Sequence, residues 1–232
     1  MFILSLDTAS PAGSIAVLDD EKLIAVISTA TDETYSSRMF RQLEFLLGEV
    51  KLSLDRMDLF AVNAGPGSFT GLRVALTATK GWAEVYTKPA VAVSGLEAVA
   101  VQSNAEGPLI PLLDAHRGQV YFGVYGRSGD RLISDGPDRV ATPEEFWTAL
   151  AELPTPGTVT VVTPDAKMLA QLSSHSETRD LSFEQVSSVL APSIGRLAYS
   201  RARRGDVVDA LTLDANYVRR SDAELHWKGP DH

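Results

Sequence analysis

Two short stretches of this chain share one form: an almost wholly apolar run that ends in an aspartate and is followed by a tight polar turn. They are Phe2 to Asp7 and Leu109 to Asp114. Short apolar runs bounded by turn residues are typical of buried strands. Further strands and then helices are expected after each run, so the sequence predicts one α/β unit that occurs twice.

The first unit is expected to have the element order βββαβαβα. Its first three strands are joined by short polar turns, which predicts an antiparallel meander. Ser68 and Thr70 are both candidate N-caps of the second long helix. The expected strands are 2–7, 14–18, 23–28, 58–63 and 89–93, and the expected helices are about 34–50, 70–86 and 94–102.

The pattern restarts after Gly107 and Pro108. Strands are expected over 109–113, 120–125, 131–134 and 159–162, with helices from Thr142 and over about 192–204. We place the boundary between 1–105 and 106–232, with the last helix in a position to pack back on the first unit. The repeated order resembles the ribonuclease-H-like halves of the actin, Hsp70 and sugar-kinase superfamily. The predicted fold is therefore α/β, with mixed sheets flanked by helices in two such subdomains.

Composition narrows the classes of function. The 232 residues include no cysteine, which excludes disulfides and thiolate metal sites. The four histidines form no i, i+4 pair on a helix, so no metal site is predicted. A net charge of −9 leaves little surface for neutralising phosphates, so strong direct binding of a large RNA is not expected. The arginine clusters are interpreted as solvated faces: Arg201, Arg203 and Arg204, and Arg219 and Arg220.

Two further features of the sequence predict the cellular location of the protein. The chain has no apolar run of about 18 residues, so no membrane-spanning helix is expected. The first basic side chain is Lys22, so the positively charged start of a secretory signal is not seen. We expect a cytoplasmic protein.

Two loops could bind phosphate. Asp7 and Thr8 follow the first strand, and a Gly-Pro-Gly-Ser turn precedes the second long helix. Backbone amides at such a junction attract anions, and Asp7 could reach a metal through water. The alternative is a polar turn in which Asp7 accepts backbone N–H groups, and we favour it. The candidate phosphate-proximal residues are Asp7, Thr8, Gly65, Gly67 and Ser68.

The two long helices could form an interface. Helix 34–50 has an apolar stripe wider than one sheet usually needs, and helix 70–86 has small residues at three- and four-residue spacing. Small residues allow another backbone to approach closely, either within the chain or from another chain. The candidate interface residues are Met39, Phe40, Leu43, Leu47, Gly71, Ala75 and Ala78.

Several segments together resemble the TsaB family. They are Ile3–Thr8 with Ser14–Leu18, Gly65–Arg73 with Lys80 and Gly81, Pro89–Ala98, Asp114–Tyr121 and Tyr217–Arg219. The likeness is strong over 1–125 and thin over 126–215. Tyr35 and Arg41 depart from the family pattern, which has His and Pro near the start of the first long helix.

The resemblance implies a non-catalytic subunit that binds TsaD. The complex transfers threonylcarbamoyl to adenosine 37 of tRNAs that read ANN codons, and a TsaE-type ATPase joins it. No cofactor is expected on this chain alone, although ATP or ADP could bind at the complex interface, and a homodimer is an alternative assembly without the partner. TsaD-like enzymes carry a His-x-x-x-His metal pair, which is absent from Ser94–Ala98 here.

Two enzymatic hypotheses compete with the scaffold hypothesis. One is an ATPase or kinase of the same superfamily, with Asp7 as the group that organises metal and water. It requires a second glycine-rich phosphate loop, and 114–118 supplies only Gly118. The other is a metalloprotease, which the missing histidine pair disfavours. The scaffold hypothesis is therefore preferred, with no catalytic residue assigned.

Overall fold

The computed structural model describes residues 1–232 except 11, 32, 130, 154–156, 174–179 and 219–232. Its first half is built on a five-stranded mixed sheet with the order β3-β2-β1-β4-β5. The first three strands pair antiparallel, as the predicted meander requires, and β1, β4 and β5 are parallel. The strands are β1 (Phe2–Asp7), β2 (Ser14–Asp19), β3 (Lys22–Ser28), β4 (Leu59–Asn63) and β5 (Ala90–Val93).

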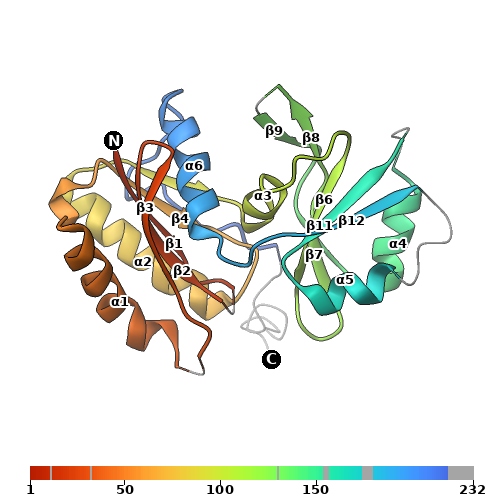
Figure 1. Ribbon diagram of the computed structural model, residues 1–232, viewed down its shortest axis with the longest axis horizontal. Coiled ribbons are helices and arrows are strands. Elements are labelled where there is room, and N and C mark those ends of the chain that lie inside the picture. Colours follow the sequence, from red (N-terminus) through yellow and green to blue (C-terminus); the bar gives the residue numbers. More distant parts are fainter. Residues whose placement is uncertain (11, 32, 130, 154–156, 174–179, 219–232) are drawn as a thin grey trace, which may run out of the picture.

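Helices cover both faces of this sheet (Figure 1). Because successive side chains on a strand point to opposite faces, Leu4 and Leu6 meet one layer and Ile3 meets the other. The first layer consists of α1 (Tyr35–Val50) and α2 (Phe69–Tyr86), with the short 3-10 helix η1 (Leu54–Arg56) between α1 and β4. The second layer is α6 (Ala191–Ala202), which returns from the far end of the chain and packs on β1, β2, β4 and β5.

The second half contains another mixed sheet. Its main order is β10-β7-β6-β11-β12, and β8 pairs with β6 and β9. Helix α3 (Gly95–Ala100) lies between the two sheets (Figure 1). The other elements are β6 (Leu109–Asp114), β7 (Val120–Phe122), β8 (Tyr125–Ser128), β9 (Arg131–Ser134), β10 (Arg139–Ala141), α4 (Pro143–Ala151), β11 (Val159–Thr163), α5 (Ala166–Ser173) and β12 (Leu181–Gln185). The predicted α/β class with mixed sheets flanked by helices is confirmed.

One predicted strand is interrupted, although both of its parts pair antiparallel with β6 in the same register. Residues 120–125 are not continuous: β7 pairs with the end of β6, while Tyr125 begins β8 and pairs with Leu109. Gly123 lies in this interruption, where a Cβ atom would lie 2.7 Å from the Tyr125 ring and 2.8 Å from the Asp138 carboxylate. The strands β10 and β12 and the helix α5 are short and were not predicted.

Other local predictions are confirmed. Ser68 caps α2 by accepting a hydrogen bond from the Gly71 amide at 3.3 Å. Thr142 and Glu145 form a reciprocal capping box at the start of α4, with Pro143 in the first turn. Arg219 and Arg220 lie outside the described residues. Among the residues that are described, no helix is both long enough and apolar enough to cross a membrane.

Candidate functional site

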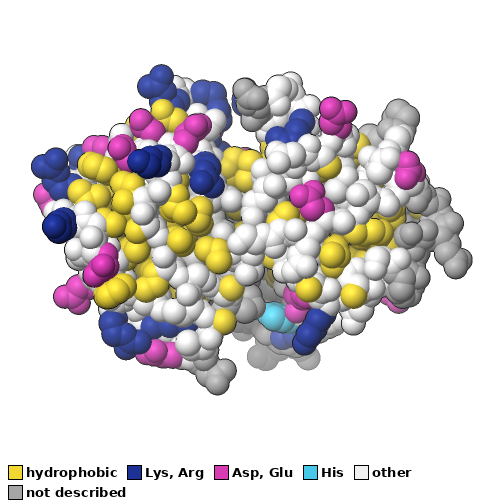
Figure 2. Space-filling view, in the orientation of Figure 1, with side chains coloured by type: hydrophobic (Ala, Val, Ile, Leu, Met, Phe, Trp, Pro, Cys, Tyr) yellow, Lys and Arg dark blue, Asp and Glu magenta, His cyan; other side chains and the backbone are white. Residues whose placement is uncertain are grey.

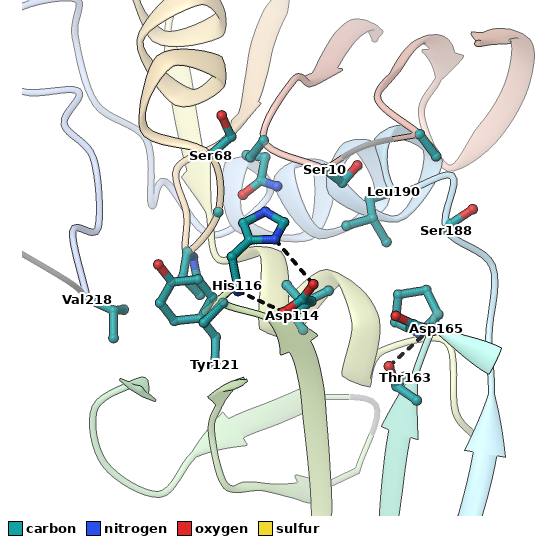
Figure 3. Close-up of a pocket in the computed structure, with 18 of the residues that line it drawn as sticks. Ser10, Ser68, Asp114, His116, Tyr121, Thr163, Asp165, Ser188, Leu190 and Val218 are labelled. Atoms are coloured by element: carbon teal, nitrogen blue, oxygen red, sulfur yellow. Dashed lines mark hydrogen bonds and ion pairs between the residues drawn. The ribbon is translucent and has the colours of Figure 1, made fainter. Parts of the chain in front are cut away.

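A cleft of about 960 Å³ lies between the two sheets. Its walls are the loops at the carboxyl ends of β1, β4, β6 and β11 (Figure 3). The carboxyl ends of parallel strands are the usual position for ligand sites in open α/β sheets. The polar lining includes Ser10, Ser68, Asp114, His116, Thr163, Asp165, Lys167 and Asn216.

Asp7 lies beneath this cleft and is fully buried. Its Oδ1 accepts hydrogen bonds from the Ala9 amide at 3.0 Å and from Asn63 Nδ2 at 2.9 Å. Its Oδ2 accepts one from Ser10 Oγ at 2.6 Å. Burial raises the pKa of Asp7, and these donors offset part of the rise. This geometry fits the favoured interpretation of Asp7 as an acceptor that holds a turn.

The loop before α2 is also bonded within the chain. The Gly65 amide donates to Asn63 Oδ1 at 2.9 Å, and the Ser68 amide donates to the Ala9 carbonyl at 3.0 Å. Thr8 Oγ1 donates to the Gly71 carbonyl at 2.6 Å. The structure therefore brings all five candidate phosphate-proximal residues together, but only Gly67 and Ser68 line the cleft. Phosphate binding there stays a prediction.

The turn after β6 forms the opposite rim. The His116 amide donates to Asp114 Oδ1 at 2.7 Å, and His116 Nδ1 lies 3.2 Å from Asp114 Oδ2. His116 and Arg117 both have left-handed backbone conformations, with φ of 57° and 55°. Such conformations are uncommon outside glycine and cluster at functional sites. His116 is thus a loop histidine, as expected, yet it faces the cleft (Figure 3).

The contribution of β11 to the cleft was not predicted from the sequence. Thr163 ends that strand, and its Oγ1 accepts a hydrogen bond from the Asp165 amide at 3.2 Å. A strand over 159–162 was predicted, and because ligand sites usually lie at the carboxyl ends of parallel strands, Thr163 could have been predicted to lie near the cleft. Asn216 was also missed, because nothing in its local sequence shows that the C-terminal segment returns to the cleft.

A second cavity of about 320 Å³ lies beside Asn216. Two carboxyl groups line it, and burial raises the pKa of both Glu97 and Asp138. Glu97 pairs with Arg201, whereas Asp138 accepts hydrogen bonds from neutral side chains. No group of three His, Cys, Asp or Glu side chains suited to a metal occurs in the part of the chain that the structure describes.

The structure corrects most of the candidate interface. Met39, Leu43, Leu47, Gly71 and Ala75 are buried, because α1 and α2 turn these faces toward the first sheet and the β1–β2 loop. They contribute to the core of this chain and are not available to another one.

The other two candidates, Phe40 and Ala78, lie on the part of the two helices that the core does not cover, which we call the α1–α2 surface. In this surface Phe40, Gly81 and Val85 are exposed, and Ala78 and Trp82 are half-buried. Phe40 is 59% exposed and Val85 is 73% exposed. The Phe40 and Trp82 rings make an edge contact with centroids 6.4 Å apart. A Cβ atom on Gly81 would meet no other atom within 4 Å.

Exposed apolar side chains are concentrated on one half of the molecule. Figure 2 shows the broader apolar area over the half that holds β3 and α1, with charged side chains around its edge, and a smaller one over the other half. Within the described residues, Ile133 is the one large exposed hydrophobic side chain that belongs to the second sheet. An apolar surface rimmed by polar groups marks an interaction site.

Comparison with known proteins agrees with this architecture. The family model described as TsaD, tRNA N6-adenosine threonylcarbamoyltransferase, matches residues 25–192. The TsaB protein of Bacillus subtilis, named a tRNA threonylcarbamoyladenosine biosynthesis protein, is 28% identical over 98% of both chains. Escherichia coli TsaB is 31% identical over 55% of this chain and 56% of its own length.

The fold is also found in solved structures. YeaZ from Pseudomonas aeruginosa superposes with a TM-score of 0.75 at 24% identity, covering 93% of this chain and 99% of its own. The Lmo2764 protein from Listeria monocytogenes, described as a candidate N-acetylmannosamine kinase, gives 0.53 at 12% identity, covering 88% of this chain and 100% of its own. Because a curated relative matches from end to end and the family model covers most of the sequence, the chain belongs to the TsaD-type family and, within it, to the TsaB proteins of tRNA threonylcarbamoyladenosine biosynthesis.

Proposed function

We propose that this chain is a non-catalytic subunit that binds a TsaD homologue and holds it in its active form. The complex would transfer threonylcarbamoyl to adenosine 37 of tRNAs that read ANN codons. The observation that carries the proposal is the exposed α1–α2 surface. The names of the relatives, which refer to threonylcarbamoyladenosine biosynthesis, support the same reaction.

The chemistry of the α1–α2 surface suits a helical partner. Ala78, Gly81, Trp82 and Val85 follow the i, i+3, i+4, i+7 spacing of one helix face. The small side chains let a partner helix approach, and the Phe40 and Trp82 rings supply apolar area at its centre. Aromatic anchors of this kind carry a large share of binding energy at interfaces.

The proposal also covers a homodimer, a TsaE-type ATPase and a nucleotide. A second copy of this chain would use the same surface, so a homodimer and the TsaD complex would exclude each other. A TsaE-type ATPase would join the assembled complex, and ATP or ADP would bind at the complex interface and not on this chain alone. The net charge of −9 supports a subunit that leaves most tRNA contacts to its partners.

Phe40→Asp is expected to weaken TsaD binding by at least about tenfold, because it places a charge at the centre of an apolar interface. The folded chain should lose less than about 1 kcal/mol, since the side chain is exposed. Phe45→Asp is the matched control: Phe45 lies on the same helix, is 61% exposed and faces about 140° away at 100° per residue. Titration calorimetry with a purified TsaD homologue measures both affinities. Equal losses for the two variants would place the interface elsewhere.

The second candidate is an ATPase or kinase-like enzyme, and the cleft at the carboxyl ends of the strands favours it. The surroundings of Asp7 disfavour the enzyme hypothesis, because its carboxylate already accepts hydrogen bonds from three protein donors. We expect the purified chain to hydrolyse ATP at well below about one turnover per second, the lower end of the usual enzymatic range. Faster hydrolysis that Asp7→Asn abolishes would establish the enzyme hypothesis.

A further inference from the structure

Over the residues that the structure describes, the main chain crosses between the two sheets twice, once from α3 to β6 and once from β12 to α6. Gln102 joins the two crossings: its Nε2 donates to the Ser187 carbonyl at 3.2 Å, and its Oε1 accepts from the Ser187 amide at 3.1 Å. Ser188, next in sequence, lies at one end of the cleft (Figure 3). This end of the cleft is therefore closed by covalent connections.

The other end of the cleft is formed by the C-terminal segment. Figure 3 shows Val218 across the cleft from Ser188. Two residues earlier, the Asn216 amide donates to the Ala64 carbonyl at 2.7 Å, which ties the segment to the carboxyl end of β4 in the first sheet. Asn216 lines both cavities, so it stands between them.

One carboxylate joins this end of the cleft to the second sheet. Asp138, between β9 and β10, accepts hydrogen bonds at Oδ2 from Asn216 Nδ2 at 3.0 Å and from Ser94 Oγ at 2.9 Å. Its Oδ1 accepts one from Tyr125 Oη at 3.1 Å. Ser94 and Asn216 are held by the first sheet, whereas Asp138 and Tyr125 belong to the second.

We propose that Asp138 is a clasp that holds the two sheets together at the end of the cleft opposite the crossing segments. Asn216 also packs against Gly65, in the loop that precedes α2: a Cβ atom added to Gly65 would lie only 2.6 Å from the Asn216 carbonyl oxygen. Asp138 therefore holds the start of this loop through Asn216.

Of the three hydrogen bonds to Asp138, those from Ser94 and Asn216 join the two halves, whereas the one from Tyr125 fixes the carboxylate on the second half. These contacts act at the end of the cleft, beside the apolar core that continues across both sheets. A ligand or partner segment that enters the cleft has to fit its width or release the clasp.

Distance measurement across the cleft tests the clasp on the chain alone, so the result does not depend on the proposed TsaD complex. Because the chain has no cysteine, Thr70→Cys and Lys167→Cys introduce two unique spin-label sites, both exposed and on opposite sides of the cleft. Asp138→Ala should lengthen or broaden the label–label distance distribution. Asp135→Ala, which removes an exposed carboxylate of the same loop, should leave it unchanged.

Hydrogen exchange gives an independent reading. In the Asp138→Ala variant, the amides of Asn216 and Gly95, which donate to Ala64 and Gly65, should exchange about tenfold faster, the size expected for loss of a single supporting hydrogen bond. If that variant does not fold, Asn216→Ala and Tyr125→Phe each remove one donor and should broaden the distances by a smaller amount. Unchanged distances and exchange in the folded variants would overturn the clasp.

Discussion

Gly71→Ala should lower the free energy of unfolding by about 3 kcal/mol, at the upper end of what overpacking a core costs. A Cβ atom at this position of α2 would overlap the Thr8 carbonyl oxygen and lie 2.9 Å from its carbonyl carbon. The neighbour cannot yield easily, because it is backbone and because Thr8 Oγ1 is itself bonded to the Gly71 carbonyl at 2.6 Å. Added volume therefore pushes α2 away from the β1–β2 loop.

Gly81→Ala is the matched control on the same helix. Gly81 is exposed and has open space around its Cα atom, so alanine should stabilise the chain by about 0.5–1 kcal/mol through its higher helix propensity. Urea unfolding followed by circular dichroism measures both changes. Similar effects at the two positions would show that the β1–β2 loop does not pack against α2 as described.

The faces of α1 and α2 show what hydrophobic periodicity in a sequence can predict and what it cannot. The small residue Gly71 correctly indicates that a backbone approaches α2 closely there, whereas Ala75 is buried in the apolar core and Ala78 is half-buried on the α1–α2 surface. The sequence does not identify that backbone, which turns out to be the β1–β2 loop of the same chain. For the same reason the stripe of Met39, Leu43 and Leu47 was assigned to a partner although the first sheet covers it. Periodicity defines a face, but what covers that face depends on contacts far apart in sequence.

The cleft was predictable only in part. Two strand ends, at Asp7 and Asp114, were expected from the apolar runs, and both lie at this junction. The remaining walls come from β11 and from the segment around Asn216, whose positions depend on how the two sheets pack. Short elements such as α5 and β12 escape sequence analysis because their tertiary contacts, and not their local propensities, specify them.

Asp7→Ala should destabilise the chain by about 3 kcal/mol at pH 7, because the Ala9 amide, Ser10 Oγ and Asn63 Nδ2 would all lose their acceptor in a buried site. Asp7→Asn should cost less than about 1 kcal/mol. It keeps one acceptor oxygen, and the Ser10 hydroxyl can reverse its role and accept from the new amide. The comparison separates the loss of hydrogen bonds from the loss of charge.

The pH dependence of the free energy of unfolding, compared between the wild type and Asp7→Asn, shows the protonation state of Asp7. Burial raises the pKa of Asp7 in the folded state above its unfolded value of about 3.9, so the folded chain binds more protons between the two values. The free energy of unfolding of the wild type should therefore fall, relative to Asp7→Asn, as pH rises from about 4 through the folded pKa, and the difference should stay constant above it. Urea titrations at closely spaced pH values measure this difference. A wild type that instead gains stability over that range would show that the three donors outweigh burial and keep Asp7 ionised, which is the state that the kinase-like hypothesis needs.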